Sequence, residues 1–261
     1  AAAGNPFYLE ELVQMLIDDG VIVDEGDVWT LRHDRLSELR IPSTLTSLLQ
    51  ARLDALPDAE RRLLQRASVI GRVFWRDALG DLSDEAKRDG AVLDELRRRG
   101  LIFRATSSVF ADTEEYGFKH AILHDVTYET VLRRERRLSH IAVARWLMAR
   151  VAGQAGAWAA TIAEHWLGAG DGATAAAWYL DAVNAAAARS EFTHAEAVAS
   201  HAIVACAAVG DAAGLGVARL RRASAEVLTA CGDLDAAGRQ VAAARALFEQ
   251  PTTSKRSPGV A

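Results

Sequence analysis

Cysteine is scarce in this chain of 261 residues, which contains only Cys206 and Cys231. Two cysteines without metal-ligand spacing exclude a disulfide framework and indicate a reducing compartment. No run of about 18 apolar residues is present, so no membrane-spanning helix is predicted. The sequence also lacks a basic excess, because 30 Lys and Arg oppose 35 Asp and Glu for a formal net charge of −5. We therefore expect a cytoplasmic protein that is not drawn to nucleic acid or membranes by general positive charge.

The short motifs of common catalytic sites are missing as well. There is no Gly-x-x-x-x-Gly-Lys-Ser/Thr loop to cradle a triphosphate, no Gly-x-Ser-x-Gly turn and no His-Glu-x-x-His pair. His120 and His124 are spaced by one helical turn, but no acidic or thiol set of matching spacing completes a zinc site. We predict that this chain alone has no catalytic residue, holds no metal ion and binds no cofactor tightly.

Composition changes near residue 150. Before it, charged residues, β-branched residues and turn signals alternate with helical patterns, whereas alanine dominates after it and Gly-Asp pairs recur at 170, 210 and 232. We expect a mostly α fold, with a winged-helix domain that has a small β-hairpin wing, followed by a TPR-like (tetratricopeptide-like) α-helical repeat array. The predicted boundaries are a helix and hairpin at 1–41, the winged-helix domain at 42–138, the repeats at 139–250 and a disordered tail at 251–261.

The N-terminal segment carries helix signals. Apolar residues recur at helical spacing between 6 and 19, Asn5 suits the N-cap, Pro6 suits the first helical position and Gly20 suits the end. Two short apolar runs then flank a polar turn and predict a hairpin with strands at 21–23 and 28–31.

The central segment has the element order of a winged helix-turn-helix domain. That order is three short helices followed by a two-stranded wing. From Pro42, helical patterns are followed by two apolar β-type stretches and a further helix that contains both His120 and His124. The expected helices are 59–70, 75–79 and 84–99, the strands are 101–104 and 116–118, and the further helix is 120–134.

The alanine-rich part matches a 34-residue helix-turn-helix repeat twice. Residues of suitable size fall at the pattern positions in one unit at Ala163, Trp166, Gly170, Ala175, Tyr179 and Ala182. They do so again at Ala225, Leu228, Gly232, Ala237, Val241 and Ala244. The segment between them fits only loosely. Alanine satisfies small positions by chance, so stacked helix pairs are better supported than the repeat type.

Three segments together resemble one family. Gly4-Asn5-Pro6-Phe7 and the following residues resemble the Gly-x-Pro segment in the helical lid of STAND-type (AAA-like) signal-transduction ATPases. The stretch 53–74 resembles the start of their winged-helix domain, and 118–129 resembles the segment after the wing that carries a sensor histidine. The bacterial branch of this family is attached to class III adenylate/guanylate cyclases or to LuxR-type regulators.

The resemblance implies specific roles. The family's lid proline, which packs on the adenine ring, corresponds to Pro6, and its sensor histidine, which reaches the ADP β-phosphate, corresponds to His120, with His124 as the alternative. Segment 1–41 is then the remnant of an ATPase lid, and the phosphate loop and Mg²⁺ site would precede residue 1. We expect this chain to be a piece of a longer ATPase, with an attached cyclase or transcription module as its output, that binds ATP or ADP and receives a protein partner or effector on its repeats.

Two other hypotheses remain open at this level. The chain could be a nucleotide-independent scaffold whose repeats bind protein. It could also be a DNA-binding winged-helix regulator, although Asp84, Glu85, Asp89, Asp94 and Glu95 place negative charge on the helix that would read the groove.

Overall fold

The computed structural model describes residues 6–24, 29–32, 42–82, 89–151, 155–210 and 214–249. The chain divides into two compact units, Ala1–Ser139 and His140–Ala261. Helices dominate both units, and the described strands form two small antiparallel sheets. The expected mostly α class is therefore confirmed. The segment expected to be a disordered tail lies outside the described residues.

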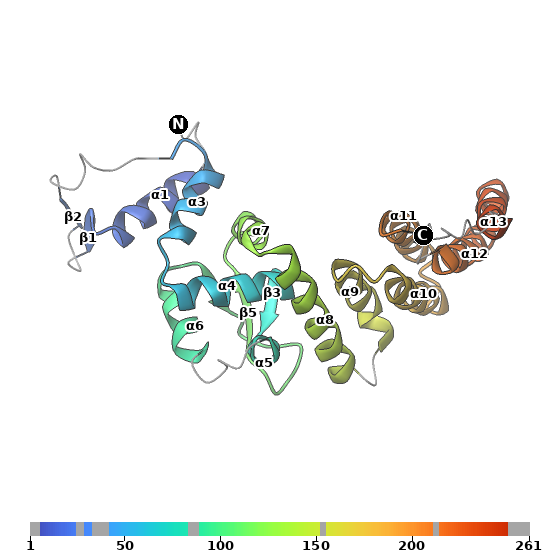
Figure 1. Cartoon of the computed structure of the whole chain (residues 1–261), viewed down its shortest axis with the longest axis horizontal. Helices are drawn as coiled ribbons and strands as arrows, with labels where there is room; N and C mark the ends of the chain where they lie inside the picture. The colour runs from blue at the N-terminus through green and yellow to red at the C-terminus, as the bar shows by residue number, and fades with distance from the viewer. Residues whose placement is uncertain are drawn as a thin grey trace, which may run out of the picture. The chain divides into compact units, whose positions relative to one another are not determined.

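A helix and a hairpin begin the first unit. They are α1 (Pro6–Asp18), β1 (Ile22–Asp24) and β2 (Trp29–Leu31), and the two strands pair antiparallel (Figure 1). Gly20 follows α1 with a φ of 65°, which glycine adopts without the steric cost that a Cβ imposes. The helix start at Pro6 and the end at Gly20 agree with the sequence, while the expected N-cap Asn5 lies outside the described part of the chain.

The rest of the first unit combines short helices with a three-stranded sheet. Its elements are α3 (Leu45–Asp54), α4 (Asp58–Ile70), β3 (Val73–Trp75), α5 (Arg76–Asp81), α6 (Asp89–Arg98), β4 (Ile102–Arg104), β5 (Glu115–Phe118) and α7 (Ala121–Thr130). The sheet is antiparallel in the order β3-β5-β4. Phe74, Tyr116 and Phe118 pack against one another on its buried face, with Phe74 between the other two rings. The sheet thereby fixes the position of the segment that leads from β5 into α7.

Two elements differ from the sequence prediction. The sequence predicted two strands in this sheet, but β3 adds a third, because Val73 and Trp75 pair with Gly117 and Glu115 far along the chain. Three residues carry too little periodicity to predict a strand without that partner. The helix expected at 120–134 is also interrupted: α7 ends at Thr130 and α8 (Arg133–Arg150) begins after it.

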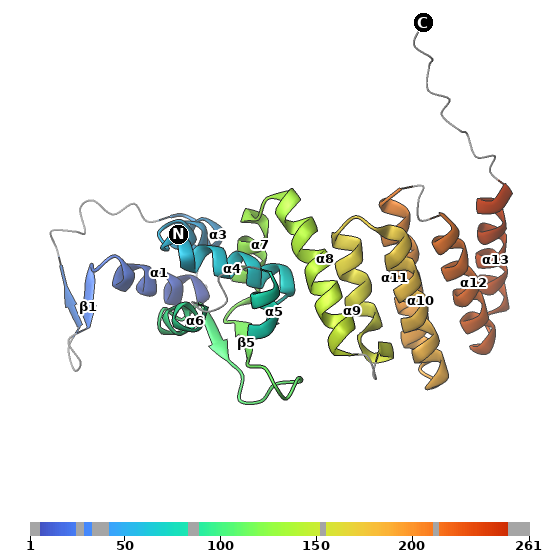
Figure 2. The same ribbon diagram turned by 60° about the horizontal axis from the view of Figure 1, so that its bottom comes forward.

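The second unit consists of consecutive helices that run alternately up and down (Figure 2). After the part of α8 that belongs to it, these are α9 (Ala155–Gly168), α10 (Gly172–Ala188), α11 (Phe192–Ala208), α12 (Gly214–Ala230) and α13 (Leu234–Glu249). Its main core cluster contains four alanines together with Tyr179, Ile203, Cys206, Val217 and Leu220. Alanine side chains allow the helix backbones to approach closely, which suits a stack without a large central core.

Two of the Gly-Asp pairs, at 170 and 232, form turns between these helices. Gly170 and Gly232 have φ values of 79° and 84°, and each ends the preceding helix. The following aspartates then cap the next helices, since Asp171 Oδ1 accepts from Thr174 N at 3.0 Å and Asp233 Oδ1 accepts from Ala236 N at 2.9 Å. Glycine as stop signal and aspartate as start signal explain why these pairs recur.

The turn between α10 and α11 offers a test of this account. Ser190 has a φ of 61° and is the non-glycine residue with positive φ in the described chain. We predict that Ser190→Gly raises the free energy of unfolding by up to about 1 kcal/mol, because the left-handed conformation penalises a Cβ. Urea denaturation measures the change. Ser200→Gly inside α11 is the control and should lower stability by about 1 kcal/mol. Equal losses in both variants would contradict the prediction.

Candidate functional site

His120 lies between β5 and α7 and is the N-cap residue of α7, with an extended backbone (φ −132°, ψ 139°). Its side chain is 15% exposed, and its ring meets the Phe7 ring edge-on with 5.1 Å between centroids. Nε2 lies 3.5 Å from Glu11 Oε1 and 3.9 Å from Glu10 Oε2, and it makes no hydrogen bond to the described residues. The predicted sensor histidine is therefore packed on α1, with one ring nitrogen facing two carboxylates.

Pro6, the other predicted site residue, is exposed and begins α1. Its neighbour Phe7 is the residue whose ring contacts His120. The structure thus brings together the start of α1 and the segment after β5, two positions that the sequence indicates separately.

Glu11 is held by a buried ion pair with Arg52, in which each side chain is 3% exposed. Arg52 comes from α3, and its Nη2 also donates to Asp18 Oδ2 at 3.1 Å and to the Arg99 carbonyl oxygen at 3.0 Å. A buried charge is very unfavourable without a partner, so these groups depend on one another's positions. The pair joins α1 to α3 and to the residue that follows α6.

Glu10 belongs to a second ion pair nearer the surface. It pairs with Lys119, and the two side chains are 47% and 41% exposed. The hydrogen bond from Lys119 holds the pKa of Glu10 below its usual value. Water and Lys119 screen the charge of the exposed Glu10, whereas Glu11 is buried and lies nearer to Nε2. Glu11 is therefore the main anionic neighbour of His120.

His124 occupies a different environment from His120. Its Nδ1 lies 2.8 Å from Asp125 Oδ1, and its Nε2 lies 3.0 Å from the carbonyl oxygen of Ser68 on α4. The hydrogen bond with His124 holds the pKa of Asp125 below its usual value. The sequence placed both histidines on one helix face, which is wrong, since His120 precedes the helix and faces α1 while His124 faces α4. With both ring nitrogens occupied, His124 has a packing role.

Glu11 and Arg52 were missed at the sequence level, although a signal for them exists. Glu11 falls at helical spacing between Tyr8 and Met15 and therefore on the buried face of α1. Arg52 lies between the buried Leu49 and Leu53 on α3 in the same way. A charge within an apolar helix face predicts a buried partner, but the sequence does not show which residue that partner is.

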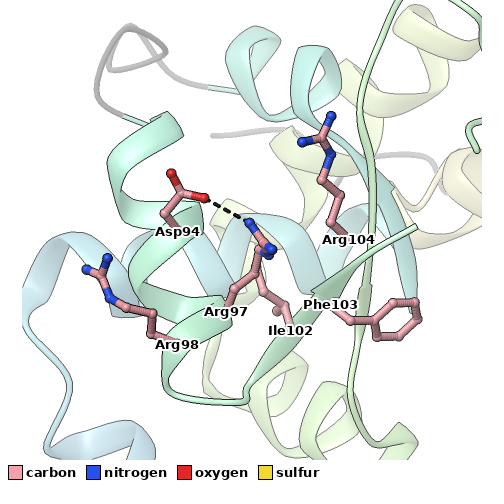
Figure 3. Close-up of a pocket in the computed structure, with 6 residues that line it drawn as sticks. All are labelled: Asp94, Arg97, Arg98, Ile102, Phe103 and Arg104. Carbon is pink, nitrogen blue, oxygen red and sulfur yellow. Dashed lines mark hydrogen bonds and ion pairs between the residues drawn. The ribbon is translucent and has the colours of Figure 1, made fainter. Parts of the chain in front are cut away.

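A pocket of about 540 Å³ lies between α6 and β4, and His120 is not among the residues that line it. Its lining comprises Asp94, Arg97, Arg98, Ile102, Phe103 and Arg104 (Figure 3). Each arginine has an acidic partner: Arg97 pairs with Asp94 at 3.0 Å, Arg98 with Glu95, and Arg104 with Glu114 at 2.7 Å. The figure also shows Arg98 pointing away from Arg97 and Arg104. The lining therefore holds three arginines and one carboxylate, and each arginine is ion-paired.

The acidic residues of α6 are paired as well. Asp89 is buried and accepts from Arg66 at 3.1 Å, so it does not project from the helix. Asp94 and Glu95 are bound by the arginines named above, while Asp84 and Glu85 lie outside the described residues. The repulsion between α6 and DNA phosphates that the sequence suggested is therefore weaker than the number of acidic residues on this helix implies.

The second unit contains a buried histidine pair. His140 Nδ1 and His165 Nδ1 are 2.9 Å apart, and the side chain of each residue is largely enclosed. Burial and the neighbouring His140 lower the pKa of His165 to about 3. A Cβ on Gly168 would lie 2.6 Å from the His140 ring, so glycine leaves the space that this ring occupies.

The described part of the chain has neither a metal-binding cluster nor a membrane-spanning helix. No three or more His, Cys, Asp or Glu side chains gather there in a way that could hold a metal ion. None of its helices is both long and apolar enough to cross a membrane.

No family model matches this chain, and no solved structure matches it. An uncharacterized protein of Rhizobium meliloti (strain 1021) is 28% identical over 221 residues, which cover 80% of this chain and 20% of that protein. The chain therefore spans about a fifth of the length of this curated relative.

The two hydrogen bonds of His124 lead to a stability prediction. We expect His124→Ala to lower the free energy of unfolding by about 1–3 kcal/mol, because it removes one of the hydrogen bonds between α7 and α4 and leaves the Ser68 carbonyl oxygen without the His124 ring nitrogen. Urea denaturation followed by circular dichroism measures the change. The control is His201→Ala, an exposed residue whose loss should cost under about 0.5 kcal/mol. Similar losses for both variants would show that the His124 contacts do not stabilise the unit.

The histidine pair leads to a prediction for pH. The folded pKa of His165 is below its unfolded value of 6.5, so its contribution to stability is complete above pH 6.5 and is lost as pH falls toward 3. Between pH 7.5 and 5.5 the wild type should lose about 1 kcal/mol more than His165→Gln, which does not titrate there. Urea midpoints at the two pH values measure the difference. Identical pH profiles would exclude a buried neutral His165.

Proposed function

We propose that this chain is the regulatory C-terminal part of a STAND-type signal-transduction ATPase. It senses bound ADP or ATP through α1 and the segment before α7 and relays that state to its helical region. The observation that carries the proposal is the contact between the start of α1 and His120, made by the Phe7 ring at 5.1 Å. Pro6 would face the adenine ring and His120 the β-phosphate.

The element order of the first unit supports this assignment. The series α4, β3, α5, α6, β4 and β5 contains three helices and a terminal hairpin, in the order of a winged helix-turn-helix domain. We assign residues 42–138 to this domain and residues 1–41 to the lid. His120 then follows the last wing strand, where the family carries its sensor.

The properties of the two histidines favour His120 over His124 as the sensor. Among the described residues His120 Nε2 has no hydrogen-bond partner, so it could donate a hydrogen bond to a phosphate oxygen, a role that suits imidazole. Both nitrogens of His124 are already bonded. The fit to a nucleotide is partial, because the carboxylates of Glu10 and Glu11 lie next to Nε2 and must move before a phosphate can approach.

The second unit supports an interaction role. We assign it to a TPR-like array, since Ala163, Ala175, Tyr179 and Ala182 fill the pattern positions of one repeat and are all buried. Gly170 and Gly232 stand at the turns that the pattern requires. Such arrays present extended surfaces to protein segments, so a protein partner or effector is the expected ligand of this unit.

The remaining parts of the switch would belong to a longer protein. The much greater length of the Rhizobium relative is compatible with this arrangement. The phosphate-binding loop and the Mg²⁺ site would lie in the ATPase core, and this chain alone would not hydrolyse ATP. The output would be an attached cyclase or transcription module, controlled by a ligand-biased equilibrium between two arrangements.

The test begins with the coding region upstream of residue 1, read in frame. A Gly-x-x-x-x-Gly-Lys-Ser/Thr loop there defines the longer protein to be produced. We predict that His120→Ala in that protein raises the Kd for ADP about tenfold, the value of one hydrogen bond to a charged group, and raises that for ATP less.

His124→Ala is the matched control, and it should lower stability without changing the ratio of ADP to ATP affinity. Isothermal titration calorimetry measures both constants. An unchanged ratio in His120→Ala, or a start codon directly before residue 1 with no loop, would support the scaffold hypothesis instead.

A further inference from the structure

We infer that Glu11 is the positioning residue of His120 and competes with a nucleotide phosphate for the same imidazole nitrogen. This inference rests on the proposed function for the phosphate and on the observed contacts for Glu11. Glu11 then sets how readily the sensor histidine is released from α1.

The charged groups around His120 single out Glu11. From α1, Glu11 Oε1 approaches Nε2 to 3.5 Å, whereas Glu10 Oε2 is 3.9 Å away. Lys119, next to His120 in the chain, pairs with Glu10 and offsets its charge at the surface. Arg52 lies on the far side of Glu11 and binds Oε2, which leaves Oε1 for His120.

Glu11 is also the more rigid of the two carboxylates. Its side chain is 3% exposed, in contrast to 47% for Glu10, and it is ion-paired within the joint of α1 and α3. Moving its carboxylate alone would leave Arg52 buried with less compensating charge, which is strongly unfavourable. Release of His120 is therefore coupled to a movement of α1 and its buried partners together.

Glu11 and a nucleotide phosphate would compete for His120 Nε2 because both are hydrogen-bond acceptors. Carboxylate and phosphate oxygens accept hydrogen bonds from the same donors, and one N–H cannot be directed well at both. Two negative groups converging on that nitrogen would also repel each other. Binding of a phosphate to His120 would thus displace Glu11, and the Arg52 link to the Arg99 carbonyl would carry that displacement to the end of α6.

The first measurement needs no nucleotide. The ¹⁵N resonances of the His120 imidazole are recorded for the wild type and for Glu11→Gln, with Glu10→Gln as the matched control. We expect Glu11→Gln to shift the Nε2 resonance clearly and Glu10→Gln to change it much less, which a role of Glu11 in stability alone would not produce.

A second variant guards against misfolding. Glu11→Gln combined with Arg52→Met removes both members of the buried pair, and the only carboxylate of this group that loses its bond to Arg52 is Asp18, which is 23% exposed and remains in contact with water. The double variant should therefore fold even where the single variant does not. Circular dichroism confirms the fold. An unchanged Nε2 resonance in a folded variant that lacks Glu11 overturns the inference.

The second measurement uses the longer protein defined above. We expect Glu11→Gln to lower the Kd for ADP about tenfold, since the competing acceptor is weakened, and Glu10→Gln to change it little. Unchanged ADP affinity in Glu11→Gln, together with the expected loss in His120→Ala, refutes competition and leaves the proposed function standing. Unchanged ADP affinity in His120→Ala refutes the proposed function, and with it the competition, whereas the ¹⁵N result still decides whether Glu11 positions His120.

Discussion

The first unit depends on one buried interaction, the ion pair between Glu11 and Arg52. Arg52 reaches three acceptors that come from α1, from the end of α1 and from the residue after α6. Because burying these charges is favourable only when every partner is in place, α1 cannot lie on α3 in an arbitrary orientation. The apolar contacts of Tyr8, Met15 and Leu48 stabilise the packing of α1 on α3. The ion pair between Glu11 and Arg52 determines which residues of the two helices lie opposite each other.

The two units achieve order by different means. In the second unit, small side chains pack helix on helix, and glycine followed by aspartate defines the turns at Gly170 and Gly232, so neighbouring helices carry most of the interactions. In the first unit, contacts between residues distant in the sequence hold α1, the sheet and α7 together. A nucleotide-dependent change is more easily built into the first type of unit, where the loss of one charge contact affects several elements at once.

His120 and His124 show how strongly surroundings determine the role of one residue type. His124 is part of a helix, bonded on both sides and confined to the link with α4. His120 stands before the helix, with an extended backbone that turns its ring toward α1. Four positions apart in the chain, His124 has both ring nitrogens hydrogen-bonded, whereas Nε2 of His120 lies beside Glu11 without a hydrogen bond to any residue that the structure describes.

Local signals in the sequence determined most of the helices, the helix ends at Gly20 and Gly170 and the mostly α class, because periodicity and glycine act within a few residues. Pro6 and His120, with His124 as the alternative, were candidates only through the resemblance to a family. Only the tertiary structure decided that β3 is a strand, that Arg52 is the partner of Glu11 and that His120 faces α1. Each of these outcomes depends on a contact between segments far apart in the chain, and neither spacing nor composition records which segments meet.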